Sequence, residues 1–116
     1  MINGAHLIIY TRDADADRAF FRDVLGYPSV DAGHGWLIFK APPTELAMHP
    51  TEGAASFDLY LMCDDLAATI AELAAKDVET TKPVEDAGWG VVTAIRLPGG
   101  GEVGLYEPRH PRATDL

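Results

Sequence analysis

The chain lacks most features that mark secreted, membrane-spanning or disulfide-stabilised proteins. Its single cysteine, Cys63, cannot form a disulfide within the chain, and we expect it to be buried and unreactive. No apolar run approaches the roughly 20 residues that a membrane-spanning helix needs. The first ten residues also lack the basic region and the small-residue cleavage site of a secretory signal. We therefore expect a cytoplasmic protein that does not act at a membrane.

Positive charge is scarce as well. The chain has 9 basic and 18 acidic side chains, which give a formal net charge of −9. This balance repels phosphate backbones, and the one short basic stretch, Arg109–Arg112, lies among prolines near the C-terminus. The glycines at Gly99–Gly101 precede a strand-like segment instead of a helix, so they do not form a phosphate loop. Nucleic acid is therefore not an expected partner, whereas a cationic ligand is compatible with the charge but is not implied by it.

The chain does contain an internal repeat, in which the same order of predicted secondary-structure elements occurs twice. In residues 6–27 an alternating apolar segment is followed by an aspartate-rich stretch and then by an amphipathic helical run, and residues 58–79 repeat that order. Aligning Asp13 with Asp65 brings the two copies into register. Aspartates at these places cap helices, because a carboxylate accepts hydrogen bonds from the free N–H groups of the first turn. We therefore predict a helix in each copy, capped by Asp13 or Asp15 in the first and by Asp64 or Asp65 in the second.

Strand-like segments follow each predicted helix. The segments that we expect to form strands are 35–41, 45–50, 90–98 and 102–107, with weaker strands at 28–31 and 80–84. A small polar linker, 51–56, separates the two halves. The sequence therefore predicts an α+β fold with mixed strands, made of two tandem βαβββ modules. Module one covers about 1–52 and module two about 53–116, within a single domain spanning 1–116.

Two such modules in 116 residues resemble the vicinal oxygen chelate superfamily, which includes glyoxalase I, bleomycin-resistance proteins and extradiol dioxygenases. The motifs that carry the resemblance are HLIIYTRD at 6–13, AFFRDVLGY at 19–27 and LPGGGEVGLYEP at 97–108. The resemblance implies a curved mixed sheet around a cavity and a homodimer, as relatives commonly form. It does not imply one activity, because this fold hosts many.

Metal-using members of that superfamily hold a divalent ion with one histidine on the first strand of each module and one glutamate or histidine on the last. Only His6 matches this set cleanly, while Asp58 places a shorter carboxylate where the second module would have a histidine. Ala47 and Gly104 occupy the two remaining positions and have no ligand atom. A substitute set of His6, His49 and Asp58 would suit zinc, iron, manganese or nickel. The resemblance therefore implies a degenerate metal site, and we expect no cofactor.

Strand alternation predicts which side chains line the cavity. If His6 faces the cavity, Tyr10 does too, and Leu7 and Ile9 belong to the core. The same alternation places four further side chains in the core, namely Leu46, Met48, Val103 and Leu105. A small-molecule site is usually an apolar cavity with a few polar atoms that converge on the ligand. Tyrosine and tryptophan rings also occur in sheets for packing alone. The side chains that this reasoning places along the cavity are His6, Tyr10, Trp36, His49, Asp58, Tyr60, Trp89 and Tyr106.

Three functions follow from these residues, and the sequence does not decide whether the protein is an enzyme. The first is binding of a small, planar or aromatic molecule without metal, which the empty position at Gly104 favours; we expect that glycine to enlarge the cavity beside Tyr106. The second is a divalent-metal-dependent isomerase, lyase or dioxygenase using His6, His49 and Asp58. The third is a metal-free enzyme in which His6 and Asp58 act as acid and base.

Overall fold

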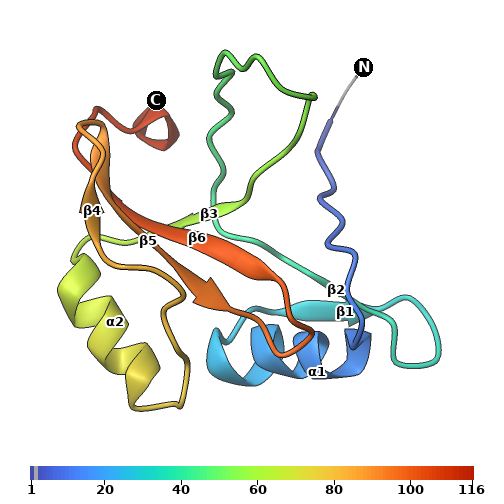
Figure 1. Ribbon diagram of the computed structural model, residues 1–116. Helices are drawn as coiled ribbons and strands as arrows, with labels where there is room; N and C mark the ends of the chain where they lie inside the picture. Colours follow the sequence, from blue (N-terminus) through green and yellow to red (C-terminus); the bar gives the residue numbers. More distant parts are fainter. Residues whose placement is uncertain (2) are drawn as a thin grey trace.

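The computed structural model describes residue 1 and residues 3–116, and it has the predicted α+β architecture. A two-stranded sheet pairs β1 with β2, and a four-stranded sheet has the order β3-β6-β5-β4 (Figure 1). Strand β3 is parallel to β6, and the other pairs are antiparallel. In chain order the elements are α1 (Ala14–Ala19), η1 (Phe20–Val24), β1 (Ser29–Asp31), β2 (Leu37–Phe39), β3 (Tyr60–Met62), α2 (Leu66–Ala74), β4 (Glu85–Asp86), β5 (Gly90–Arg96), β6 (Glu102–Pro108) and η2 (Ala113–Asp115).

An aspartate caps each helix, as predicted, and the structure selects Asp13 over Asp15 and Asp65 over Asp64. The Asp13 carboxylate accepts a hydrogen bond from the Ala16 N–H at 3.0 Å, and the Asp65 carboxylate accepts one from the Ala68 N–H, also at 3.0 Å. The first helix continues from α1 into η1, a π-helical segment, and stops before Gly26, whose φ of +71° suits a residue without a side chain.

The second half of the chain forms a complete βαβββ unit, as predicted, although the strand before the hairpin, β4, lies at Glu85–Asp86 and not at 80–84. The strands β5 and β6 pair along their whole length on either side of the glycine turn. Strand β3 pairs with the other edge of β6, and Tyr60 lies opposite Gly104. Alternation along β6 sorts its side chains as expected. Val103 and Leu105 are buried in the core on one face, and Tyr106 lies on the other face.

The core lies between the two helices and one face of β5 and β6. It is built from large aliphatic side chains and one phenylalanine, and its buried members are Phe20, Leu66, Leu73, Val78, Ile95, Leu97, Val103 and Leu105. One polar contact also joins the two halves of the chain. The buried Asp17 of α1 accepts a hydrogen bond at 2.7 Å from the Gly99 N–H in the β5–β6 turn.

The first half departs from the prediction at its start. Residues 6–10 form no strand, and Figure 1 shows this N-terminal segment standing apart from the four-stranded sheet. Leu7 and Ile9 keep 55% and 38% of their surface exposed, so their predicted place in the core is wrong. The alternation of side chains was present in the sequence, but a strand also needs a partner. Within the described residues, this segment has no backbone hydrogen bond to another strand.

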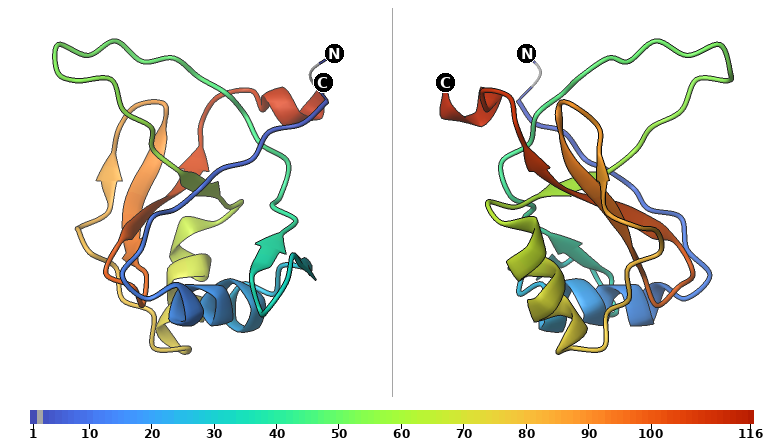
Figure 2. Two further views of the ribbon diagram at one scale, coloured as in Figure 1. Left: turned by 90° about the vertical axis from the view of Figure 1, so that its right-hand side faces the viewer. Right: turned by 60° about the vertical axis from the view of Figure 1, so that its left-hand side comes forward.

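The segment between β2 and β3 departs in the same way. Residues 40–59 contain no helix or strand and extend away from the sheet as an open loop (Figures 1 and 2). Leu46 and Met48, predicted to lie in the core, are 88% and 84% exposed. In this chain the first half therefore contributes α1, η1, β1 and β2 to the regular structure described. None of the described helices has both the length and the apolar character needed to span a bilayer.

Candidate ligand site

Three of the predicted lining residues meet on the face of the four-stranded sheet that is turned away from the core. Tyr60 of β3, Trp89 before β5 and Tyr106 of β6 form an aromatic cluster, with ring centroids 5.9 Å apart for Tyr60–Trp89, 5.8 Å for Tyr60–Tyr106 and 5.1 Å for Trp89–Tyr106. The rings meet edge to face, which is a favoured geometry for aromatic pairs. Tyr106 is buried, whereas Tyr60 and Trp89 remain 37% and 44% exposed. The cluster is therefore an aromatic surface with one buried and two open members.

Gly104 lies directly beneath this cluster. A Cβ atom added to Gly104 would come within 2.8 Å of Cγ of Tyr60 and still closer to two other atoms of that ring. The expectation that Gly104 enlarges a cavity is therefore wrong, because the Tyr60 ring already occupies the space. The missing side chain instead allows the Tyr60 ring to lie against β6 and to reach Tyr106.

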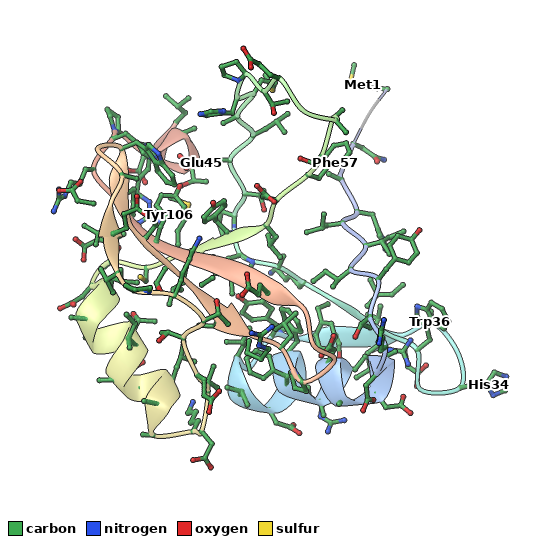
Figure 3. All side chains as sticks on the ribbon, in the orientation of Figure 1. Met1, His34, Trp36, Glu45, Phe57 and Tyr106 are labelled. Carbon is green, nitrogen blue, oxygen red and sulfur yellow. The ribbon has the colours of Figure 1, made fainter. Side chains whose placement is uncertain are left out.

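Two polar groups lie at the Tyr106 end of the cluster. The Tyr106 hydroxyl donates a hydrogen bond to Oε1 of Glu45 at 3.2 Å, and Nε2 of His110 is 3.4 Å from the same hydroxyl. Figure 3 shows Glu45 beside Tyr106. Burial raises the pKa of Tyr106, and the neighbouring Glu45 carboxylate raises it further. The site therefore combines aromatic surface, a carboxylate and an imidazole.

Neither Glu45 nor His110 was among the residues predicted to form a site. Glu45 begins the predicted strand 45–50, and the alternation that placed His49 along the cavity puts Glu45 on the same face, although the structure contains no strand there. His110 follows β6 in the C-terminal tail, where the sequence offers only its spacing of four residues from Tyr106. Both come close to Tyr106 through tertiary structure, which no local pattern encodes.

The remaining candidates lie outside this cluster. His6 and Tyr10 belong to the exposed N-terminal segment, and His49 is exposed in the 40–59 loop, where its Nδ1 is 2.7 Å from the carbonyl oxygen of the next residue. Asp58 is exposed two residues before Tyr60. Trp36 lies far from Tyr106 (Figure 3), and its ring is 4.8 Å from the Arg18 guanidinium carbon. That these residues bind a ligand stays a prediction.

The donor set that the family resemblance implies for a metal does not fit this arrangement. Across residue 1 and residues 3–116, no three histidine, cysteine, aspartate or glutamate side chains lie close enough to hold one ion. His6 and His49 are carried by two separate exposed segments, and Gly104 contributes no ligand atom. The described hydrogen bonds also include none between His6 and Asp58, the pair expected to act as acid and base.

Cys63 is half-buried instead of fully buried, and it lies on the core side of β3. Its thiol donates a long hydrogen bond to the Tyr106 carbonyl oxygen at 3.5 Å. Burial raises the pKa of the Cys63 thiol, and nearby carboxylates raise it further. A thiol with a raised pKa is mostly protonated near neutral pH, which agrees with the expectation that Cys63 is unreactive.

Solved structures share this fold at low sequence identity. A lactoylglutathione lyase from Agrobacterium tumefaciens is 23% identical with a TM-score of 0.61, over 85% of this chain and 88% of that chain. TnmS3, an antibiotic binding protein from Streptomyces sp. CB03234, is 21% identical with a TM-score of 0.60, over 90% and 99%. A superfamily member from Sphaerobacter thermophilus is 20% identical with a TM-score of 0.66, over 91% and 98%. Such likeness shows the fold and leaves the activity open.

Sequence comparison defines the family more directly. No curated protein matches the chain in sequence. A family model, in contrast, matches residues 4–108, which is nearly the whole chain, and the motifs at 6–13, 19–27 and 97–108 all fall within the matched range. The protein therefore belongs to the Glyoxalase/Bleomycin resistance protein/Dioxygenase superfamily.

Proposed function

We propose that this protein binds a small planar aromatic molecule without a metal ion, in the manner of the resistance and sequestration proteins of its superfamily. The observation that carries the proposal is the aromatic cluster of Tyr60, Trp89 and Tyr106, with two partly exposed rings and polar groups at one end. Exposed ring faces stack on flat ligands, and a few polar atoms orient them. The fold likeness to TnmS3, described as an antibiotic binding protein, is consistent with such a role.

The absence of a metal is part of the proposal. Its support is that Gly104 stands where metal-using relatives carry a carboxylate, and that the Tyr60 ring fills the space above it. The two enzymatic alternatives need His6 and Asp58, with His49 for the metal enzyme. In the described part of the chain, His6, His49 and Asp58 do not lie close enough together to hold one metal ion. No observation favours either alternative over binding.

We also propose that the protein acts as a homodimer. Its support is the apolar surface that a single chain leaves uncovered: Leu7, Tyr10, Leu46 and Phe57 are 55%, 91%, 88% and 95% exposed. Exposed apolar surface of this kind on extended segments is usually covered by another chain. Light scattering coupled to size exclusion should give twice the monomer mass, and a monomer at all accessible concentrations would contradict this proposal.

Binding is tested with acridine, a flat aromatic probe whose fluorescence reports its environment. Replacing Trp89 removes a stacking surface, so Trp89→Ala should weaken acridine binding on the order of tenfold. Trp36→Ala is the comparison variant, because Trp36 is an exposed candidate residue that lies away from the cluster, so a loss confined to Trp89→Ala supports the cluster as the site. Equal losses in the two variants, or no measurable acridine binding to the unmodified protein, would overturn the proposed site. Stoichiometric bound metal that disappears in His6→Ala would overturn the metal-free proposal.

A further inference from the structure

Glu45 holds the 40–59 loop against the aromatic cluster. From residue 40 to residue 58, Glu45 is the one residue that is not exposed. Its carboxylate accepts two hydrogen bonds, one from the Tyr106 hydroxyl at 3.2 Å and one from the Ala113 N–H at 2.5 Å. The other side-chain hydrogen bonds described for residues 41–58 stay within the loop. The loop thus places one carboxylate at one end of the cluster, at the hydroxyl of its buried ring.

Both groups that donate to this carboxylate are neutral. The cationic side chains of the adjacent C-terminal stretch pair with other carboxylates: Arg109 with Asp86 at 2.6 Å, and Arg112 with Asp64 at 3.0 Å. The Arg112 charge also acts on Tyr106 and lowers its pKa, against the larger effects of burial and Glu45. No ion pair is described for Glu45 among residue 1 and residues 3–116. The negative charge of Glu45 is therefore solvated by neutral donors and is not cancelled by a protein cation in direct contact.

A negative charge beside aromatic rings favours one class of ligand. The faces of tryptophan and tyrosine rings attract cations through their quadrupole, and a nearby carboxylate adds a Coulombic attraction in the same direction. The acidic chain, with a formal net charge of −9, adds a long-range field of the same sign. All three contributions favour a positively charged ligand over a neutral one of the same shape.

We infer that the ligand of this site is a planar aromatic cation, and that Glu45 is the residue that sets this charge preference. The inference rests on the proposed function, since it takes the aromatic cluster as the binding surface. It adds what that proposal leaves open, namely the charge class of the ligand and the residue that selects it.

The test compares two probes of nearly the same shape. N-methylacridinium carries a fixed positive charge and no N–H donor, whereas acridine is neutral at slightly alkaline pH. The unmodified protein should bind the cation more tightly than acridine, on the order of tenfold at low ionic strength. Glu45→Gln keeps the size of the side chain and an acceptor oxygen but removes the charge, so it should abolish most of that preference. Glu52→Gln is the matched control, because it removes the same charge from an exposed position in the same loop.

The outcomes separate this inference from the proposed function. A preference for the cation that Glu45→Gln removes and Glu52→Gln retains supports the inference. If both probes bind equally, or if Glu52→Gln reduces the preference as much as Glu45→Gln, then Glu45 is not the selecting residue, although the aromatic site stands. If neither probe binds the unmodified protein, the proposed function itself fails. The comparison within the unmodified protein does not depend on whether any variant folds.

Discussion

The Tyr60 ring lies against Gly104 in the parallel pair of β3 and β6, and the glycine is what makes room for the ring. Glycine in the middle of a strand weakens the strand, but at position 104 it allows the Tyr60 ring to pack against its neighbours. Tyr60 then contacts both Trp89 and Tyr106, with ring centroids 5.9 Å and 5.8 Å away. The surface that we propose as a ligand site therefore depends on one missing side chain.

Gly104→Ala should destabilise the fold, because the added methyl group overlaps the Tyr60 ring. Overpacking of this kind costs about 1–3 kcal/mol of unfolding free energy, measurable by urea denaturation. Gly101→Ala is the control, since its Cβ would come no closer than 3.9 Å to a neighbouring atom. In a Tyr60→Ala background the cost of Gly104→Ala should shrink, because the clash is gone. Strictly additive free energies in this double-mutant cycle would contradict the packing that we describe.

Asp17 should contribute more to stability than the neighbouring acidic residue on the same helix. Its carboxylate is buried and holds the Gly99 N–H at 2.7 Å, so Asp17→Ala leaves a donor of the β5–β6 turn without its partner. We expect a loss of about 1–3 kcal/mol in unfolding free energy. Asp15→Ala removes a carboxylate that is 97% exposed and paired with Arg18 at the surface, and it should cost much less. Similar losses for the two variants would argue against the Asp17–Gly99 link.

The start of α2 offers a comparison between two adjacent aspartates. Asp65 accepts a hydrogen bond from the Ala68 N–H at 3.0 Å, whereas Asp64 pairs at the surface with Arg112. Asp65→Ala should therefore cost about 1 kcal/mol of unfolding free energy through loss of the cap. Asp64→Ala should cost less, since an exposed ion pair contributes little. Thermal unfolding of the two variants measures the difference. A larger loss of stability for Asp64→Ala would show that Asp64, and not Asp65, caps the helix.

Stability should decline at alkaline pH in a way that depends on Tyr106. Burial raises the pKa of Tyr106 above its ordinary value of 10.0, so the folded chain retains a proton that the unfolded chain releases. The contribution of the Tyr106 hydroxyl to the unfolding free energy is fully present below the ordinary tyrosine pKa. It is lost as the pH rises through the raised pKa of the folded state. Urea denaturation between about pH 9 and pH 11 should show this decline in unfolding free energy.

Tyr106→Phe separates this effect from other groups that titrate in the same range. The variant should have a shallower decline, because it has no hydroxyl to titrate, whatever its stability near neutral pH. Burial also raises the pKa of Tyr27 and Cys63, and both remain in the variant, so some decline persists. Equal slopes in the unmodified protein and Tyr106→Phe would refute the assignment.

Much of the candidate site could be predicted before its geometry was known. Strand alternation placed Tyr60 and Tyr106 on one face, opposite Val103 and Leu105, and the structure shows that arrangement. It failed for residues 6–10, where the same kind of pattern produced a predicted strand that the structure does not contain. The difference lies in the partner: β6 has neighbours on both sides, whereas residues 6–10 have none among the described residues.

The amino-acid sequence by itself determined the local elements: an aspartate cap at the start of each helix, the β5–β6 hairpin and the alternation of its side chains. Each depends on residues within a few positions of one another or on a period along one strand. Only the tertiary structure decided that Tyr60 fills the space over Gly104 and that Glu45 reaches Tyr106. These contacts join residues 44 and 61 positions apart in the chain. A sequence pattern can indicate which face a side chain takes, but what it meets there depends on the packing of distant segments.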